Sequence, residues 1–308
     1  MASAAKHLIA GDLVAFPTET VYGLGADASN SAAVARIYSV KGRPNDHPLI
    51  VHIASIDRMG DWASDVPEYA IALAREFWPG PMTLVLKRSE LAGDFVTGGQ
   101  DTVGVRVPNH VVALALLEAF EKAGGNGVAA PSANRFGHVS PTSAGAVVNE
   151  LGEYLSTDDV VLDGGICSVG VESTIIDCTG DLPRVLRPGA ITTGMIEAST
   201  RLKVLSNEQV EIRVSGSLQN HYAPAAKVLL GESPQAGQGF IAFAKTETPE
   251  GVIRLASPHN DEEFARVLYS ALREADTQGL GEVVVMQPTG IGIAVAIRDR
   301  LARATNGR

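Results

Sequence analysis

The chain has 308 residues, of which 45% are hydrophobic and 19% are charged. This composition excludes a disordered chain, which is poorer in apolar residues, and at roughly 150 residues per domain the length predicts two domains. Acidic residues (35) outnumber basic ones (25), so the chain lacks the basic excess with which a protein neutralises a nucleic-acid backbone. Any positive charge that binds an anion is therefore expected in a local pocket.

Cysteine usage and hydropathy further narrow the classes of protein to which the chain can belong. Cys167 and Cys178 are too few for a disulfide framework and have no zinc-ligand pattern beside them, so we expect two buried, reduced thiols. No apolar run reaches the ~18 residues of a membrane span, and residues 1–7 do not resemble a signal peptide. The expectation is a cytoplasmic protein with no membrane contact and no stable nucleic-acid binding.

Residues 1–205 alternate between short apolar runs and amphipathic segments, which is typical of an α/β domain. Strands are expected at 13–16, 49–53, 83–86, 103–107, 127–130, 174–177 and 184–186. Helices are expected at 31–40 and 111–123. Two more helix starts are predicted, one capped by Asp65 with Pro67 in its first turn and ending at Trp78, the other at Ser140-Pro141.

The remaining third of the chain reads differently. Residues 206–226 are polar with weak periodicity and predict an ordered linker. Apolar runs at 228–230, 240–243 and 283–286 predict strands, and Asn260 followed by Glu263 predicts the start of an amphipathic helix. A last helix is expected at 292–304. The predicted organisation is thus a domain over 1–205, a linker over 206–226 and a small α/β domain over 227–308.

Two polar segments in the first domain carry candidate binding residues. Residues 16–25 end an apolar run with threonines and glycines, which provide hydroxyls and close backbone approach to a ligand, although an ordinary turn uses the same residues. Lys41, Arg43, His47 and His52 follow. Lys41 and Arg43 alternate around a glycine, so an extended chain would turn both toward one cavity. The cluster suits a polyphosphate and a carboxylate; the alternative is a solvated surface loop.

Cations and hydroxyls also adjoin later apolar runs. Arg106 lies within the run 103–107, where it is either part of a buried ion pair or a bidentate clamp for a carboxylate. Residues 131–134 follow a strand, at the strand end where α/β proteins commonly bind ligands, and Ser173 and Arg187 adjoin two further runs. No Ser-His-Asp or Cys-His arrangement is indicated. The pattern predicts anion binding by cations, hydroxyls and backbone, without a protein nucleophile.

Six motifs occur in a fixed order: PTETVYGL at 17–24, KGRP at 41–44, PLIVH at 48–52, PSAN at 131–134, GVEST at 170–174 and LRPG at 186–189. In this combination they resemble the YrdC-type threonylcarbamoyl-AMP synthases. HYAP at 221–224 and the small domain after it resemble the long, two-domain form of that family. The resemblance implies a YrdC-like domain with a twisted mixed sheet and a deep cavity, plus a smaller Rossmann-like α/β C-terminal domain.

The resemblance also implies a reaction and its residues. L-Threonine, bicarbonate and ATP would give L-threonylcarbamoyladenylate and pyrophosphate, and downstream proteins would transfer the threonylcarbamoyl group to tRNA. Lys41 and Arg43 would be the catalytic cations, with Mg²⁺ on the ATP. L-Threonine would contact Thr20, His52, Arg106, Ala130 and Ser173. ATP would contact Arg43, His47, Thr102, Ser132, Asn134, Ser140, Arg187 and, from a linker that covers the cavity, Tyr222. Position 47 is usually asparagine in this family.

Two other functions stay open at this point. Related single-domain proteins bind double-stranded RNA without making an adenylate, but the net charge of −10 and the linker tyrosine argue against that reading here. Carbamoyltransferases that use carbamoyl phosphate contain related domains, together with zinc-binding and acylphosphatase-like domains that this sequence does not contain. Pyrophosphate release that depends on both threonine and bicarbonate distinguishes all three.

Overall fold

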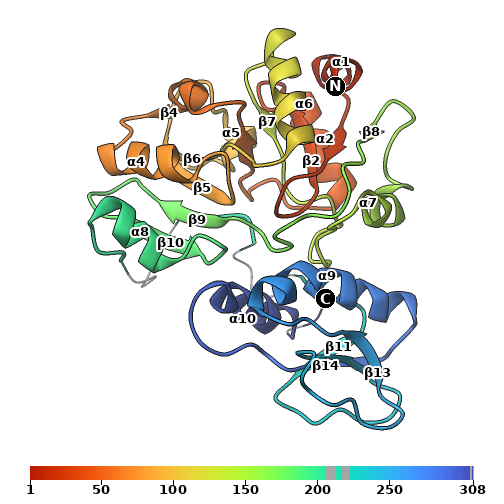
Figure 1. The fold of residues 1–308 in the computed structure, drawn as a ribbon. Helices are drawn as coiled ribbons and strands as arrows, with labels where there is room; N and C mark the ends of the chain where they lie inside the picture. Colours follow the sequence, from red (N-terminus) through yellow and green to blue (C-terminus); the bar gives the residue numbers. More distant parts are fainter. Residues whose placement is uncertain (206–211, 217–221, 306, 308) are drawn as a thin grey trace.

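The computed structural model describes residues 1–205, 212–216, 222–305 and 307. Figure 1 shows two α/β domains, with the C-terminal domain (blue) packed beneath the N-terminal one. The N-terminal domain contains a large mixed sheet and the C-terminal domain a smaller parallel sheet. Within the described residues, no helix is long and apolar enough to cross a membrane.

The described part of the N-terminal domain forms one sheet of ten strands, in the order β10-β9-β5-β6-β3-β7-β2-β1-β8 with β4 paired to β5. β3 is parallel to β6 and antiparallel to β7, and this mixture confirms the predicted mixed sheet. The strands are β1 Val14–Phe16, β2 Gly23–Asp27, β3 Ile50–His52, β4 Ala63–Ser64, β5 Met82–Arg88, β6 Thr102–Arg106, β7 Val128–Ala129, β8 Val160–Val161, β9 Thr174–Asp177 and β10 Arg184–Arg187.

Helices cover this sheet. They are α1 Ala2–Ala10, α2 Ser31–Lys41, α3 Met59–Trp62, α4 Glu68–Phe77, α5 Asp94–Thr97, α6 Val111–Lys122, α7 Ala144–Leu151 and α8 Thr193–Thr200, with a 3-10 turn at Ile56–Arg58. The helices predicted at 31–40 and 111–123 are confirmed as α2 and α6. α2 starts where Asn30 accepts hydrogen bonds from two amides of the first turn.

Two predicted helix starts are wrong. Asp65 does not cap α4, because it has a left-handed φ of 48° and the helix begins directly after Pro67. Ser140 does not start a helix either, because its hydroxyl donates a hydrogen bond to the buried carboxylate of Glu172 (2.6 Å). Ser143 caps α7 instead. Backbone conformation at Asp65 and a long-range hydrogen bond at Ser140 therefore replace the predicted caps.

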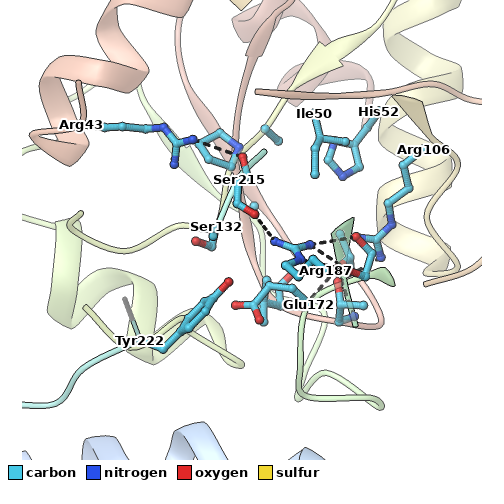
Figure 2. A pocket seen from close by; sticks show the side chains of 17 residues that line it. Arg43, Ile50, His52, Arg106, Ser132, Glu172, Arg187, Ser215 and Tyr222 are labelled. Atoms are coloured by element: carbon cyan, nitrogen blue, oxygen red, sulfur yellow. Dashed lines mark hydrogen bonds between the residues drawn. The ribbon is translucent and has the colours of Figure 1, made fainter. Parts of the chain in front are cut away.

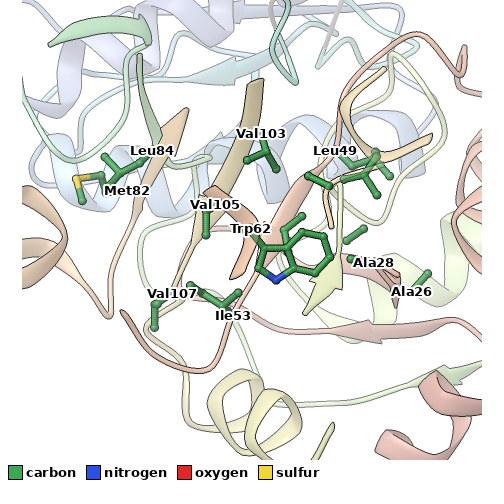
Figure 3. Close-up of a cluster of buried hydrophobic side chains, with 14 of the residues drawn as sticks. Ala26, Ala28, Leu49, Ile53, Trp62, Met82, Leu84, Val103, Val105 and Val107 are labelled. Atoms are coloured by element: carbon green, nitrogen blue, oxygen red, sulfur yellow. The ribbon is translucent and has the colours of Figure 1, made fainter. Parts of the chain in front are cut away.

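Trp62 lies at the centre of the main core (Figure 3). Its side chain is fully buried among apolar residues that include Leu84 of β5 and Val103 and Val105 of β6. The indole N–H still has a partner, the carbonyl of Asn126 at 3.2 Å, so burial leaves no donor unsatisfied. This core makes the sheet a rigid support for the loops at its edge.

The C-terminal sheet is parallel throughout, in the order β11-β14-β12-β13. Its elements are β11 Lys227–Leu230, β12 Gly239–Ile241, β13 Ile253–Ala256, α9 Asp261–Thr277, β14 Glu282–Val285 and α10 Ile293–Ala304. Asn260 caps α9 as predicted, accepting from the Glu263 amide at 2.8 Å. β13 was not predicted, since Arg254 interrupts its apolar run. In Figure 1, α9 and α10 lie between this sheet and the N-terminal domain.

The two domains share a hydrophobic core. Val21, Val139 and Val171 come from N-terminal loops, yet they pack in one buried cluster with Phe264 and Leu268 of α9. Val21 and Val171 lie in sequence motifs, and Val139 lies five residues after PSAN. The packing of the C-terminal domain therefore bears directly on loops of the motif region.

Candidate active site

A cavity of about 520 Å³ lies between the N-terminal sheet and described residues of the linker (Figure 2). Most of the predicted site residues line it, namely Thr20, Arg43, His52, Arg106, Ala130, Ser132, Ser173, Arg187 and Tyr222. These residues come from eight separate stretches of the sequence. The fold therefore brings the motifs together at one place.

Two arginines face the cavity and are linked through Ser215 (Figure 2). Arg43 donates from Nη2 to the Pro48 carbonyl (3.0 Å) and to Ser215 Oγ (3.2 Å). Arg187, the last residue of β10, donates from Nη1 to the Ser215 carbonyl (2.8 Å) and from Nη2 to the Ser173 carbonyl (2.9 Å). All these acceptors are neutral oxygens, so the two guanidiniums keep their positive charge for an anion.

Arg106 ends β6 on another part of the wall. Its Nη2 lies 2.8 Å from Glu19 Oε2 and donates to Thr20 Oγ1 at 3.0 Å, and the arginine and the glutamate are both buried. The buried ion pair that the sequence left open is therefore present. It fixes the guanidinium at the cavity wall, and carboxylate binding by Arg106 stays a prediction.

His52 is paired in register with Arg106 across β3 and β6. Burial and the neighbouring Arg106 charge lower the pKa of His52 to about 3, so the imidazole is neutral at neutral pH. The ring packs edge-on against Phe16, with 5.8 Å between centroids. A neutral imidazole offers one donor and one acceptor without adding charge, which suits a polar ligand beside an already cationic wall.

Lys41 does not line the cavity. It ends α2, and Gly42 follows with a left-handed φ of 61°, so the expectation that an extended chain turns Lys41 and Arg43 toward one cavity is wrong. The Lys41 ammonium instead donates to the carbonyls of Ser132 (2.6 Å) and Asn134, and burial lowers its pKa well below the usual range. Lys41 thus orders the loop that carries Ser132.

Two predicted ATP contacts lie beside the cavity rather than on its wall. Thr102 lines a smaller adjoining cavity of about 290 Å³, which shares Ile50 and Ser215 with the main one. His47 packs edge-on against Phe136, with 5.5 Å between ring centroids. The side chain of Asn134, also predicted, donates to two carbonyls of its own loop.

Glu172 connects the cavity to the C-terminal domain. Its Oε1 accepts from Ser140 (2.6 Å), and its Oε2 accepts from the Tyr269 hydroxyl and from Arg300 Nε, both at 2.8 Å. Burial opposes ionisation, yet the charges of Arg300 and Arg187 lower the pKa of Glu172 to about 2. The carboxylate on the cavity wall is therefore ionised and held by two helices of the other domain.

Tyr222 lies over this network. It has a left-handed φ of 64° and is buried, and its ring stacks on Tyr269 with 5.8 Å between centroids. The Arg300 guanidinium lies 5.2 Å from the Tyr222 ring centroid. Two stretches of the predicted linker, 206–211 and 217–221, lie outside the described residues, and the second includes His221.

Several residues of the cavity wall received no role in the sequence analysis, among them Glu172, Ser215 and Gly216. Glu172 lies in the GVEST motif directly before the predicted Ser173, and that position was the available signal. Ser215 and Gly216 lie in a polar linker whose composition gives none. Within the described residues, no group of three His, Cys, Asp or Glu side chains is placed to hold a metal ion.

Comparisons with known proteins agree with this geometry. The family model for Sua5, YciO and YrdC, described as "Telomere recombination", matches residues 6–189. A second model, described as the C-terminal domain of threonylcarbamoyl-AMP synthase, matches residues 191–306. Together they cover both domains of the chain.

Individual relatives match over nearly their whole length. Threonylcarbamoyl-AMP synthase of Pyrococcus abyssi is 40% identical over 99% of this chain and 94% of its own, and that of Bacillus subtilis is 39% identical over 100% and 93%. The solved structure of P. abyssi Sua5 with L-threonine has a TM-score of 0.87, with 38% identity over 98% of this chain and 93% of that one. Escherichia coli YciO, at 23% identity and a TM-score of 0.51, shares the fold over 60% of this chain.

The fold and these matches define an enzyme of the nucleotidyltransferase class, built on a YrdC-like sheet with a second α/β domain. The chain belongs to the Sua5/YrdC family of threonylcarbamoyl-AMP synthases. The predicted family, fold class and enzymatic activity are confirmed, and the RNA-binding alternative is not favoured.

Proposed function

We propose that this enzyme joins L-threonine, bicarbonate and ATP into L-threonylcarbamoyladenylate inside the described cavity. The observation that carries this assignment is the division of one cavity wall into two cationic parts. One part holds Arg106 with Thr20 and His52, and the other holds Arg43 and Arg187 joined through Ser215. Each part suits a different anion, the first a carboxylate and the second a polyphosphate.

In this assignment, L-threonine lies along the first part. Arg106 binds its carboxylate, while Thr20, Ser173 and His52 offer polar partners to the amine and the hydroxyl. Ala130, at the end of β7, contributes backbone groups. Buried polar groups that require a substrate hydroxyl discriminate strongly against an analogue without it, so the site selects threonine through these partners.

ATP lies along the second part, with its phosphates at Arg43 and Arg187 and its remaining contacts at Ser132 and Tyr222. Thr102 extends this site into the adjoining cavity. His47, Asn134 and Ser140 do not line the main cavity, so in this proposal they support the wall through their neighbours. Lys41 acts in the same way, by holding the backbone of the Ser132 loop.

The reaction requires two steps. The threonine amine first attacks the carbon of bicarbonate, with loss of water, or of CO₂, with release of a proton, and forms the N–C bond of a carbamate. A carbamate oxygen then attacks the α-phosphorus of ATP, and the bond to the departing pyrophosphate breaks. Neither step uses a protein nucleophile. The chain holds two anions side by side and neutralises charge that moves onto pyrophosphate, which is catalysis by positioning and electrostatics.

Mg²⁺ enters this proposal on the ATP phosphates. Glu172 lines the described cavity, but both of its oxygens already accept hydrogen bonds, so the donor set favours a metal held by phosphates and water over one held by protein carboxylates. When bound, Mg²⁺ would neutralise phosphate charge. Arg43 and Arg187 would do so from the protein side.

We further propose that residues 206–226 act as a lid between a catalytic domain over 1–205 and an anchoring domain over 227–308. Ser215, Gly216 and Tyr222 line the cavity, which supports this role. A lid excludes water, and the product is a mixed anhydride that water would hydrolyse. The product then passes to downstream proteins that modify tRNA, so ATP and tRNA place this activity in the cytoplasm.

The decisive experiment is pyrophosphate release measured with each substrate omitted in turn. We expect release to require ATP, threonine and bicarbonate together, and Arg43→Met and Arg187→Met to raise the KM for ATP. Release that proceeds without threonine or bicarbonate would contradict the assignment. For the lid, ATP with threonine should slow amide exchange at 212–216 and 222–226, and unchanged exchange there would reject it.

A further inference from the structure

Arg300 of α10 is a buried cation of the C-terminal domain whose hydrogen bonds cross into the N-terminal domain. Its side chain is 1% exposed. Nε donates to Glu172 Oε2 at 2.8 Å, and Nη2 donates to the Pro188 carbonyl at 3.0 Å. Glu172 directly precedes Ser173, and Pro188 directly follows Arg187. Arg300 therefore holds the segment that carries Ser173 and the segment that carries Arg187.

We propose that Arg300 is a positioning residue for nucleotide binding. It neutralises and orients Glu172, and thereby leaves the charge of Arg187 available to the phosphates of ATP. This inference rests on the proposed binding of those phosphates at Arg187. It gives the C-terminal domain a part in the reaction beyond anchoring the lid.

Electrostatics around Glu172 support this role. The charged groups that face the carboxylate are Arg300 from α10 and Arg187 from β10, and Asp299 pairs with Arg300 from the same helix. The hydroxyl of Tyr269 hydrogen-bonds to the carboxylate, and Tyr222 stacks on Tyr269. Without Arg300, Arg187 would be the remaining cation that faces Glu172 within the part of the chain that the structure describes. Its attraction to the carboxylate would then compete with its attraction to a phosphate.

Domain packing alone does not account for the buried ion pair between Arg300 and Glu172. The valines at 21, 139 and 171 already bury an apolar contact with α9. Gly170 also packs so closely that a Cβ there would lie 2.4 Å from the Arg266 Cα. A buried ion pair is often no more stabilising than apolar side chains of the same volume. A role at the neighbouring cavity explains why these two buried positions carry charges.

The test compares Arg300→Met with the double variant Arg300→Met/Glu172→Gln, which removes both charges. We expect the single variant to raise the KM for ATP by about tenfold, the equivalent of one lost charge-assisted contact, with a smaller change in the KM for threonine. The double variant should return the KM for ATP to within about threefold of wild type, because no uncompensated carboxylate then opposes Arg187. Arg298→Met is the matched control, since Arg298 lies on the same helix and binds carbonyls of its own domain.

The pH profile separates a charge effect from a loss of packing. In wild type the pKa of Glu172 is about 2, so its charge is constant over neutral pH. Once Arg300 is removed, burial raises the pKa of this carboxyl. The KM defect of Arg300→Met should therefore grow as the pH rises through that raised pKa and be absent from the double variant.

Three results would overturn the inference: an unchanged KM for ATP in Arg300→Met, no restoration in a folded double variant, or a defect that does not depend on pH. If Arg300→Met does not fold, the double variant still decides, because it buries no unpaired charge. Arg187→Met distinguishes a failure of phosphate binding at Arg187 from a failure of the positioning role of Arg300. If it too leaves the KM for ATP unchanged, phosphate binding at Arg187 fails as well; if it raises that KM, the role of Arg300 alone fails.

Discussion

A Cβ atom on Gly216 would lie 2.0 Å from the hydroxyl oxygen of Tyr222. Gly216 also has a φ of 80°, which side chains other than glycine rarely adopt. These two linker residues both line the cavity, and they fit together because one of them has no side chain. The contact fixes the Tyr222 ring where it stacks on the C-terminal domain.

Gly216→Ala should therefore displace Tyr222 or residues 212–216. We expect a rise in the KM for ATP of about tenfold or more, the equivalent of at least ~1.4 kcal/mol of lost binding. Gly231→Ala is the control, because Gly231 has a similar φ of 74° with nothing within 4 Å of its added Cβ. Steady-state kinetics of both variants check this, and equal effects at the two glycines would attribute the change to backbone strain alone.

Lys41 and Arg43 should respond differently to substitution, although they share one motif. Lys41→Ala removes the donor for two buried carbonyls, at ~1–3 kcal/mol for each unsatisfied group, so its melting temperature should fall. Arg43→Ala should keep the fold and lose ATP affinity, because Arg43 lines the cavity. Thermal unfolding and KM measurements distinguish the two. A stable Lys41→Ala variant without activity would instead support a catalytic Lys41.

Arg106→Lys keeps the charge but loses the planar fork of the guanidinium. We expect the KM for threonine to rise about tenfold while the KM for ATP stays within twofold. Arg58→Lys serves as the control, because Arg58 pairs with Glu121 outside the cavity. If Arg106→Lys lowers the melting temperature and leaves both KM values unchanged, the Arg106–Glu19 pair is structural only.

His52 makes stability depend on pH. Its pKa falls from 6.5 to about 3 on folding, so between these values the unfolded chain binds a proton that the folded chain excludes. Stability should therefore fall as pH falls from 6.5 toward 3, by up to ~1.4 kcal/mol per pH unit. Denaturant unfolding between pH 5 and 6.5 checks this, above the range in which carboxylates titrate. His52→Gln should flatten the slope, whereas the exposed control His259→Gln should retain it.

The sequence predicted regular elements well wherever one apolar face decides the structure. α2 and α6 begin and end within a few residues of their predicted bounds, and α9 begins where its cap predicted, because caps and periodicity agree there. β13 was missed because its four residues are all half-buried around Arg254, which leaves no alternation to detect. Asp65 and Ser140 were misread because long-range partners and backbone conformation override local capping preferences.

In the candidate site, too, local motifs predicted some residues correctly, while long-range contacts decided the others. The family resemblance that the motifs carry was enough to group Arg43, Arg106 and Arg187 at one cavity. The contact of the Lys41 side chain with the Ser132 loop, in place of the cavity, was not predictable. It depends on the left-handed Gly42 and on carbonyls about 90 residues away in the chain. The link between Glu172 and Arg300 spans 128 residues, and Arg300 lies outside the motifs, so no pair of motifs indicates the contact. Contacts of that range are set by how the domains pack.

Val21, Val139 and Val171 are buried beneath α9, although they belong to the loops that carry the motifs. A chain ending at residue 205 would turn these three side chains toward water, at a cost of roughly 1.5–3 kcal/mol for each fully exposed valine, and would create an apolar patch beside the substrates. Such a fragment should associate with itself or lose order in its binding loops first.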